Sequence, residues 1–139
     1  MSNFNYNTMA QENKELLIKD LWARLPYGVK YMRYSWDYDT DQELPVIETL
    51  ECADKDGYIN HRRVYTVDDI KPYLFPFSSM TEEQKREFDI SMDMGYAAAY
   101  NAEINCANRM IDFFNKYHLD YRCLIPMGLA IDATGKNIY

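Results

Sequence analysis

A chain of 139 residues that is 47% hydrophobic, with five glycines and five prolines, is expected to fold as a single globular domain spanning residues 1–139. The net charge of −7, from 15 basic and 22 acidic residues, disfavours a protein that coats DNA or RNA, because such proteins neutralise phosphates. The sequence has no apolar run long enough to cross a bilayer, and its first residues lack the features of a signal peptide. We therefore expect a soluble cytoplasmic protein with no membrane or bulk nucleic-acid partner.

The cysteines and tyrosines narrow the expected class of protein further. Three widely spaced cysteines, Cys52, Cys106 and Cys123, form neither a disulfide framework nor a zinc motif, which favours free thiols in a reducing compartment. Thirteen tyrosines are an unusually large number. Aromatic rings with a polar tip suit surfaces that contact a ligand or partner, although packing at the edge of a small sheet would also use them.

The first predicted element is an amphipathic helix that begins at Thr8 and ends before Pro26. The residues Thr8-Met-Ala-Gln11 fit a capping box, in which side chains at each end satisfy backbone amides. Apolar residues at helical spacing form one stripe: Ile18, Leu21, Trp22 and Leu25. We expect this stripe to face the core and charged residues such as Asp20 to face solvent.

Three strands over residues 29–67 are predicted to form an antiparallel meander. In the first strand, residues 29–37, alternation places Tyr31 and Arg33 on one face and Tyr34 and Trp36 on the other.

The second and third strands are predicted at residues 44–53 and 58–67. A turn at Asp54–Gly57 separates them, with Gly57 supplying a positive φ. In the third strand, His61, Arg63 and Tyr65 share a face, and Arg62 lies on the opposite face.

Two main helices should follow the sheet and pack on it, giving an α+β fold. Regular structure is expected to pause at Pro72 and Pro76, because proline lacks an amide donor. Residues 81–84 fit a second capping box that starts a helix ending near Gly95. Residues 103–117 form the other helix. Its predicted buried stripe is Ala107, Met110, Ile111, Phe114 and Tyr117. Residues 129–131 are a possible edge strand.

Three sequence blocks resemble a family of small proteins, without an assigned function, from gut anaerobic bacteria and their phages and mobile elements. The blocks are KDLWARLPYGV at 19–29, IKPYLFPFSSMTEEQK at 70–85 and DFFNKYHLDYRCLI at 112–125, the last continuing to GLAID at 128–132. Two features depart from the family pattern, namely Pro126 and a private segment at residues 91–105. The resemblance implies a phage or mobile-element accessory protein in the cytoplasm of a host cell, and it supplies no catalytic residues.

A run of acidic residues raises the possibility of a calcium loop. Asp37, Asp39, Asp41 and Glu48 fall at positions 1, 3, 5 and 12 of such a loop. The sixth position is Gln42, where the sharp turn requires glycine, so a solvated acidic hairpin is the alternative. We predict no metal site, no cofactor and no catalytic residues.

A small basic site is the best candidate for ligand binding. Arg33, His61, Arg63 and Tyr65 are predicted to bind a nucleotide-like anion through stacking and charge-assisted hydrogen bonds. The alternative is that Arg62 and Arg63 pair with acidic neighbours such as Glu48 or Glu51 across the sheet.

Two functions therefore remain open, both non-enzymatic, and catalysis ranks a distant third. In the first, the protein sequesters a nucleotide-like host defence signal. In the second, it is an interaction module or inhibitor that presents an aromatic and methionine-rich surface to a host protein or to a second copy. The residues predicted for that surface are Met92, Met94, Tyr96 and Tyr100.

Overall fold

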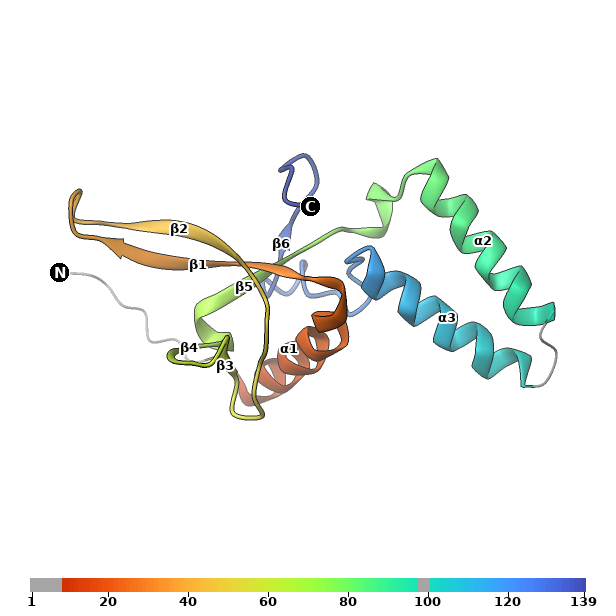
Figure 1. The fold of residues 1–139 in the computed structure, drawn as a ribbon, viewed down its shortest axis with the longest axis horizontal. Helices are drawn as coiled ribbons and strands as arrows, with labels where there is room; N and C mark the ends of the chain where they lie inside the picture. Colours follow the sequence, from red (N-terminus) through yellow and green to blue (C-terminus); the bar gives the residue numbers. More distant parts are fainter. Residues whose placement is uncertain (1–8, 98–100) are drawn as a thin grey trace. The chain divides into compact units, whose positions relative to one another are not determined.

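The computed structural model describes residues 9–97 and 101–139, apart from the side chains of Arg63, Val64 and Ala97, and it has the predicted α+β class. The chain divides into two compact units, residues 1–72 and 73–139. The elements of the first unit are α1 (Gln11–Arg24), η1 (Leu25–Tyr27), β1 (Lys30–Asp37), β2 (Gln42–Thr49), β3 (Tyr58–Ile59), β4 (Arg62–Thr66), η2 (Val67–Asp69) and the start of β5 (Ile70–Leu74) (Figure 1). The second unit contains the end of β5 and η3 (Phe77–Ser79), α2 (Glu82–Ala97), α3 (Ala102–Lys116) and β6 (Ile131–Asp132). A single domain over residues 1–139 stays a prediction.

Helix α1 supplies apolar side chains to the core of the first unit. Ile18 and Leu21 are buried as predicted. Trp22 was placed wrongly in the buried stripe: it is 47% exposed, and its indole N–H donates to the carbonyl of Ala53 at 2.8 Å, which keeps the polar edge of the ring at the surface. The predicted cap at Thr8 lies outside the described residues, and α1 begins at Gln11.

The polar face predicted for α1 is also wrong at Asp20. Asp20 and Arg24 are fully buried and form a bidentate ion pair, with Arg24 Nε 2.8 Å from Asp20 Oδ2 and Nη2 3.1 Å from Oδ1. Spacing of four residues on a helix brings the two side chains together, so the buried charges are neutralised within α1 itself.

The predicted meander is correct for its first two strands only. β1 and β2 form a long antiparallel hairpin, with Lys30 opposite Thr49 and Asp37 opposite Gln42 (Figure 1). The other neighbour of β1 is β5, with Tyr31 opposite Pro72. In the predicted meander, residues 58–67 would pair with the second strand, whereas β5 pairs with the opposite side of β1 and leaves β2 at the edge. β5 also passes through Pro72, where we expected a pause in regular structure.

Residues 58–67 instead fold back on themselves as the hairpin β3–β4. Asn60 and His61 both adopt positive φ values, 53° and 59°, and they make the two-residue turn between Ile59 and Arg62. Two consecutive positive φ values are the geometry of a tight hairpin turn. The alternation of the sequence continues through this turn, which is why we read one strand instead of two.

In the second unit, α2 and α3 pack against each other along their length (Figure 1). The predicted capping box is confirmed, because Thr81 N–H donates to Gln84 Oε1 at 3.0 Å and Gln84 N–H to Thr81 Oγ1 at 3.1 Å. α2 continues past Gly95, where we expected it to end. A Cβ at Gly95 would lie 2.8 Å from Cys106 Sγ, so glycine permits the close approach of the two helices.

The stripe predicted for α3 is correct in part. Met110, Phe114 and Tyr117 are half-buried, whereas Ala107 and Ile111 are exposed. The most buried side chains of α3 include Cys106 and Phe113, which the prediction left out. The return strand is present as β6, which pairs in parallel with β5, Tyr73 lying opposite Ile131. Packing of α2 and α3 on the sheet of the first unit stays a prediction. Among the described residues, no helix combines the length and apolar character needed to cross a membrane.

Candidate functional site

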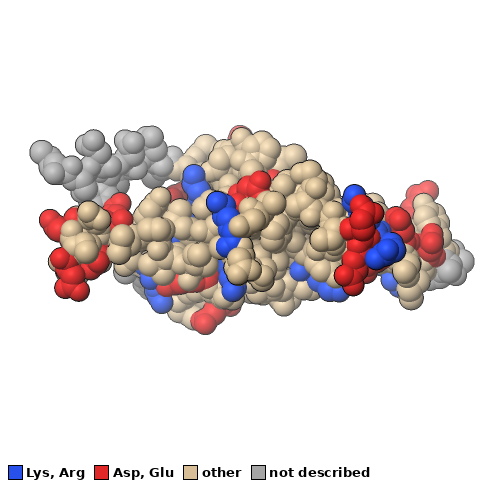
Figure 2. Space-filling view, turned by 90° about the horizontal axis from the view of Figure 1, so that it is seen from above, with Lys and Arg blue, Asp and Glu red and all other residues tan. Residues whose placement is uncertain are grey.

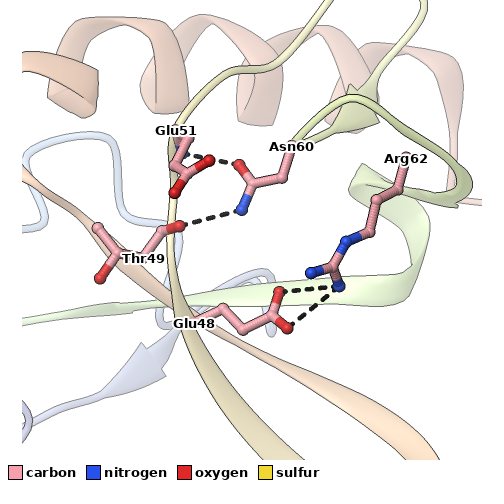
Figure 3. Close-up of a pocket in the computed structure, with 5 residues that line it drawn as sticks. All are labelled: Glu48, Thr49, Glu51, Asn60 and Arg62. Atoms are coloured by element: carbon pink, nitrogen blue, oxygen red, sulfur yellow. Dashed lines mark hydrogen bonds and ion pairs between the residues drawn. The ribbon is translucent and has the colours of Figure 1, made fainter.

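A polar groove of about 390 Å³ lies between β2 and the β3–β4 hairpin and is lined by Glu48, Thr49, Glu51, Asn60 and Arg62 (Figure 3). Glu48 is the centre of its hydrogen-bond network. One carboxylate oxygen, Oε1, accepts from Arg33 at 2.6 Å and from Arg62 at 3.2 Å, and Oε2 accepts from the Tyr31 hydroxyl at 2.6 Å. The groove is therefore built around a carboxylate that two guanidinium groups share.

This network changes the acidity of its members. The hydrogen bond from Arg33 is the main cause that lowers the pKa of Glu48 from 4.5 to about 2. Burial, together with the hydrogen bond to Glu48, raises the pKa of Tyr31 far above its usual value. Glu48 is consequently ionised and Tyr31 protonated throughout the physiological range. Neither group is suited to act as a general acid or base near neutral pH.

Asn60 fixes the β3–β4 turn against β1, the end of β2 and the segment that follows β2. Its side-chain oxygen accepts from the backbone amides of Glu51 at 2.7 Å and Cys52 at 3.2 Å. Its side-chain nitrogen donates to the Tyr31 hydroxyl and to the carbonyl of Thr49, both at 3.0 Å. Because two acceptor and two donor positions are all used, the role of this amide is structural.

The structure brings together only part of the predicted basic site. Arg33 and Tyr65 meet, with Nη1 of Arg33 3.2 Å from the Tyr65 hydroxyl and the guanidinium 4.6 Å from the ring centroid. His61 lines a separate groove of about 380 Å³ with Cys52, Ala53, Asp54 and Tyr58. The side chain of Arg63 lies outside the described part of the structure. Binding of a nucleotide-like ligand by these residues stays a prediction.

Sequence reasoning missed Tyr31 and Asn60 as members of the network. The signal for Tyr31 was its position opposite Glu48, which follows once the β1–β2 register is known. The signal for Asn60 was the Asn60-His61 pair, because asparagine favours the positive φ of a tight turn. The pairing of Arg62 with Glu48, which we considered as the alternative, is present.

The calcium spacing does not assemble a cation site. Asp37 accepts hydrogen bonds from Asp39 N–H at 3.0 Å and Thr40 Oγ1 at 2.8 Å within the turn, and Glu48 is engaged by Arg33 and Arg62. Within residues 9–97 and 101–139, no cluster of three or more His, Cys, Asp or Glu side chains could hold a metal ion.

The β1–β2 hairpin has an exposed apolar face, which we name the hairpin face. Its members share one side of the two strands: Met32, Tyr34, Trp36, Pro45 and Ile47. Tyr34 is 53% exposed, Trp36 41% and Ile47 49%. Because Met32 is paired with Ile47 and Tyr34 with Pro45, these side chains are contiguous neighbours across the strands.

The tip of the hairpin, residues 37–43, is acidic. Its carboxylates belong to Asp37, Asp39, Asp41 and Glu43, and residues 34–47 contain no lysine or arginine. Figure 2 shows acidic side chains gathered over this tip, at the left of the view. The hairpin thus combines an apolar face with a negative end.

The predicted aromatic and methionine-rich surface on α2 is exposed in part. Met94 is 56% exposed and Tyr96 65%, whereas Met92 is half-buried and Tyr100 lies outside the described residues. The described part of this surface contains one exposed aromatic ring, Tyr96, whereas the hairpin face has two. It stays a second candidate for contact with a partner.

No protein-family model matches the chain, no curated protein is significantly similar to it, and no solved structure matches it significantly. The resemblance to small proteins of gut anaerobes and their phages therefore stays a prediction.

Proposed function

We propose that the protein is a non-enzymatic interaction module that docks through the hairpin face onto a partner protein with a basic, apolar surface. The observation that carries this proposal is the exposure of Tyr34, Trp36 and Ile47 side by side on one face of β1–β2. Aromatic residues are enriched at protein interfaces because they bury a large apolar area and keep a polar tip.

The size of the hairpin face suits a docking site. An aromatic side chain has roughly 150–250 Å² of surface, so the exposed parts of Tyr34, Trp36 and Ile47 amount to on the order of 300 Å². The largest apolar patch on a typical monomer has about this size and is often functional. At about 25 cal/mol per Å², covering this area would contribute roughly 7 kcal/mol before the costs of association.

Charge supports a basic partner over a second copy of the chain. Four carboxylates at the tip border the apolar face, and no cation occurs between Tyr34 and Ile47. Two copies that met through this face would bring like charges together, which costs free energy. Lysine or arginine residues beside apolar anchors in a partner would instead complement both parts of the hairpin.

Side chains, and not the backbone of the strand edge, are proposed to make the contact. β2 is an edge strand whose described neighbour is β1 alone. Pro45 lies in the middle of β2 and lacks an amide donor, which disfavours the addition of a partner strand along this edge.

The anion-binding alternative has weaker support. Arg33 and Arg62 both pair with Glu48, so a nucleotide-like ligand would have to compete with a carboxylate already in place. The docking module is the function that we retain, as an accessory protein that acts on a host protein in the cytoplasm.

Selection from a random peptide library tests this proposal. The bait is the full chain, and the counter-bait is the double variant Tyr34→Ser, Trp36→Ser. We expect the selected peptides to combine arginine or lysine with aromatic or aliphatic residues. Their affinity should fall at least about tenfold on the counter-bait, equivalent to about 1.4 kcal/mol.

A matched control uses the exposed residues of α2. The double variant Ile90→Ser, Met94→Ser removes two exposed apolar side chains from another surface and should bind the same peptides unchanged. Loss of binding in this control, with binding retained by the hairpin variant, would move the docking site to α2. Self-association through the hairpin face, read by sedimentation, would replace the basic partner with a second copy.

A further inference from the structure

The polar groove beside β2 has two charged side chains with unused hydrogen-bonding capacity. Glu48 already accepts from Tyr31, Arg33 and Arg62. Arg62 and Glu51 are the charged lining residues that remain.

Toward the described residues, Arg62 uses one of its guanidinium nitrogens. Its guanidinium contacts Glu48 through Nη1 alone, and its side chain is 48% exposed. A guanidinium has five N–H donors in a planar fork that fits a carboxylate. No described residue accepts from the other nitrogens of Arg62.

Glu51 provides the opposite charge. Its backbone amide is held by Asn60, but no described residue pairs with its exposed carboxylate. Both charged groups belong to the lining of one groove, with Arg62 and Glu51 drawn on opposite sides of Asn60 (Figure 3).

The walls of the groove are fixed before any ligand arrives. The Asn60 side chain makes four hydrogen bonds that attach the β3–β4 turn to Tyr31 on β1, to Thr49 at the end of β2 and to the two backbone amides at Glu51 and Cys52. Glu48 restrains one end of the Arg62 guanidinium. Restraint of this kind reduces the entropic cost of ligand binding.

The charge of the groove selects the chemical class of its ligand. A phosphate or nucleotide would meet the Glu48 and Glu51 carboxylates as well as Arg62, and an amine would meet Arg62. We propose that the groove binds a small zwitterion, an amino acid or short peptide, whose carboxylate pairs with Arg62 and whose ammonium pairs with Glu51. This site is separate from the hairpin face and does not depend on docking there.

Titrations followed by amide chemical shifts of the full chain test the proposal. The probes are glycine, β-alanine, γ-aminobutyrate and diglycine, which place the two charges at increasing separation. N-acetylglycine and glycinamide each lack one charge, and AMP and inorganic phosphate are the anionic probes. We expect at least one zwitterion to bind about tenfold or more tightly than both blocked analogues, with shifts centred on residues 48–62.

The variants Arg62→Gln and Glu51→Gln should each lower the affinity for that zwitterion by about tenfold or more. The matched controls Arg86→Gln and Glu83→Gln change exposed residues of α2 and should leave it unchanged. Equal binding of the blocked analogues, tighter binding of AMP or phosphate, or no zwitterion binding at the solubility limit would each overturn the proposal. Because Glu51 is exposed, its variant remains informative even if Arg62→Gln unfolds the hairpin.

Discussion

Glu48 on β2 lies directly opposite Tyr31 on β1, yet its closest ionic partner is Arg33, two residues further along β1 and 2.6 Å away. Arg33 and Glu48 lie diagonally across the two strands, and the long arginine side chain spans the distance between them. This arrangement leaves the Tyr31 hydroxyl free to bridge Glu48 and Asn60, so one carboxylate links β1, β2 and the β3–β4 hairpin.

The pair predicts a specific dependence of stability on pH. Folding lowers the pKa of Glu48 from 4.5 to about 2. The ionised carboxylate therefore makes its full contribution to the free energy of unfolding above pH 4.5, and this contribution is lost as the pH falls from 4.5 towards 2. Glu48→Gln should cost on the order of 3 kcal/mol at pH 7 and much less at pH 2, measured by urea unfolding. Glu43→Gln, at the exposed tip, is the control. If the difference in free energy of unfolding between the wild type and Glu48→Gln did not change with pH, the lowered pKa of Glu48 would be contradicted.

The buried ion pair of α1 should be intolerant of the loss of one partner. Asp20→Asn leaves Arg24 charged and without its bidentate carboxylate, which should destabilise the fold by roughly 3–5 kcal/mol. The double variant Asp20→Leu, Arg24→Met should recover part of that loss. Glu82→Gln, which breaks an exposed pair with Lys85, should cost less than about 1 kcal/mol. Thermal unfolding of the variants measures these differences, and equal effects for the buried and exposed pairs would refute the prediction.

Gly95→Ala should destabilise α2–α3 although alanine favours helices. The added Cβ would lie 2.8 Å from Cys106 Sγ and 3.2 Å from Arg109 Cδ. Overpacking of this kind costs typically about 1–3 kcal/mol, which outweighs a propensity gain of about 1 kcal/mol. Adding Cys106→Ala should restore stability in chemical unfolding. Asp93→Ala, on the exposed side of α2, controls for the effect of alanine on helix propensity. If Gly95→Ala were more stable than the wild type, the close approach of α2 and α3 at Gly95 would be contradicted.

The two residues of the β3–β4 turn should respond in opposite directions to glycine. His61→Gly relieves a positive φ and should be neutral or stabilising by up to about 1 kcal/mol. Asn60→Gly keeps the φ but removes four hydrogen bonds, and should cost roughly 2–4 kcal/mol. Urea unfolding compares the pair directly, and equal changes would show that the Asn60 amide does not fix the turn.

Local patterns in the sequence predicted much of the secondary structure. Alternation along residues 29–37 correctly separated Tyr31 and Arg33 from Tyr34 and Trp36. The capping box at Thr81 correctly located the start of α2. These features depend on neighbours within a few residues, which a single sequence displays.

Strand order and the polar groove depend on distant residues and were predicted less well. The break at Asn60-His61 is concealed by alternation that continues through it, and the position of β5 beside β1 requires a pairing across about forty residues. From the sequence, the pairing of Arg62 with Glu48 was predicted only as an alternative to ligand binding. Its geometry follows from the hairpin turn, which strand alternation alone does not reveal.

Chemical-shift mapping with the tightest peptide from the library selection tests the docking proposal most directly. In a Trp22→Phe background, Trp36 is the single tryptophan, so its indole signal reports on the hairpin face without overlap. We predict that the largest shifts fall on residues 32–47, that they include the Trp36 indole, and that binding weakens as salt rises. Largest shifts on α2 and α3, with an unchanged Trp36 indole, would contradict docking through the hairpin face.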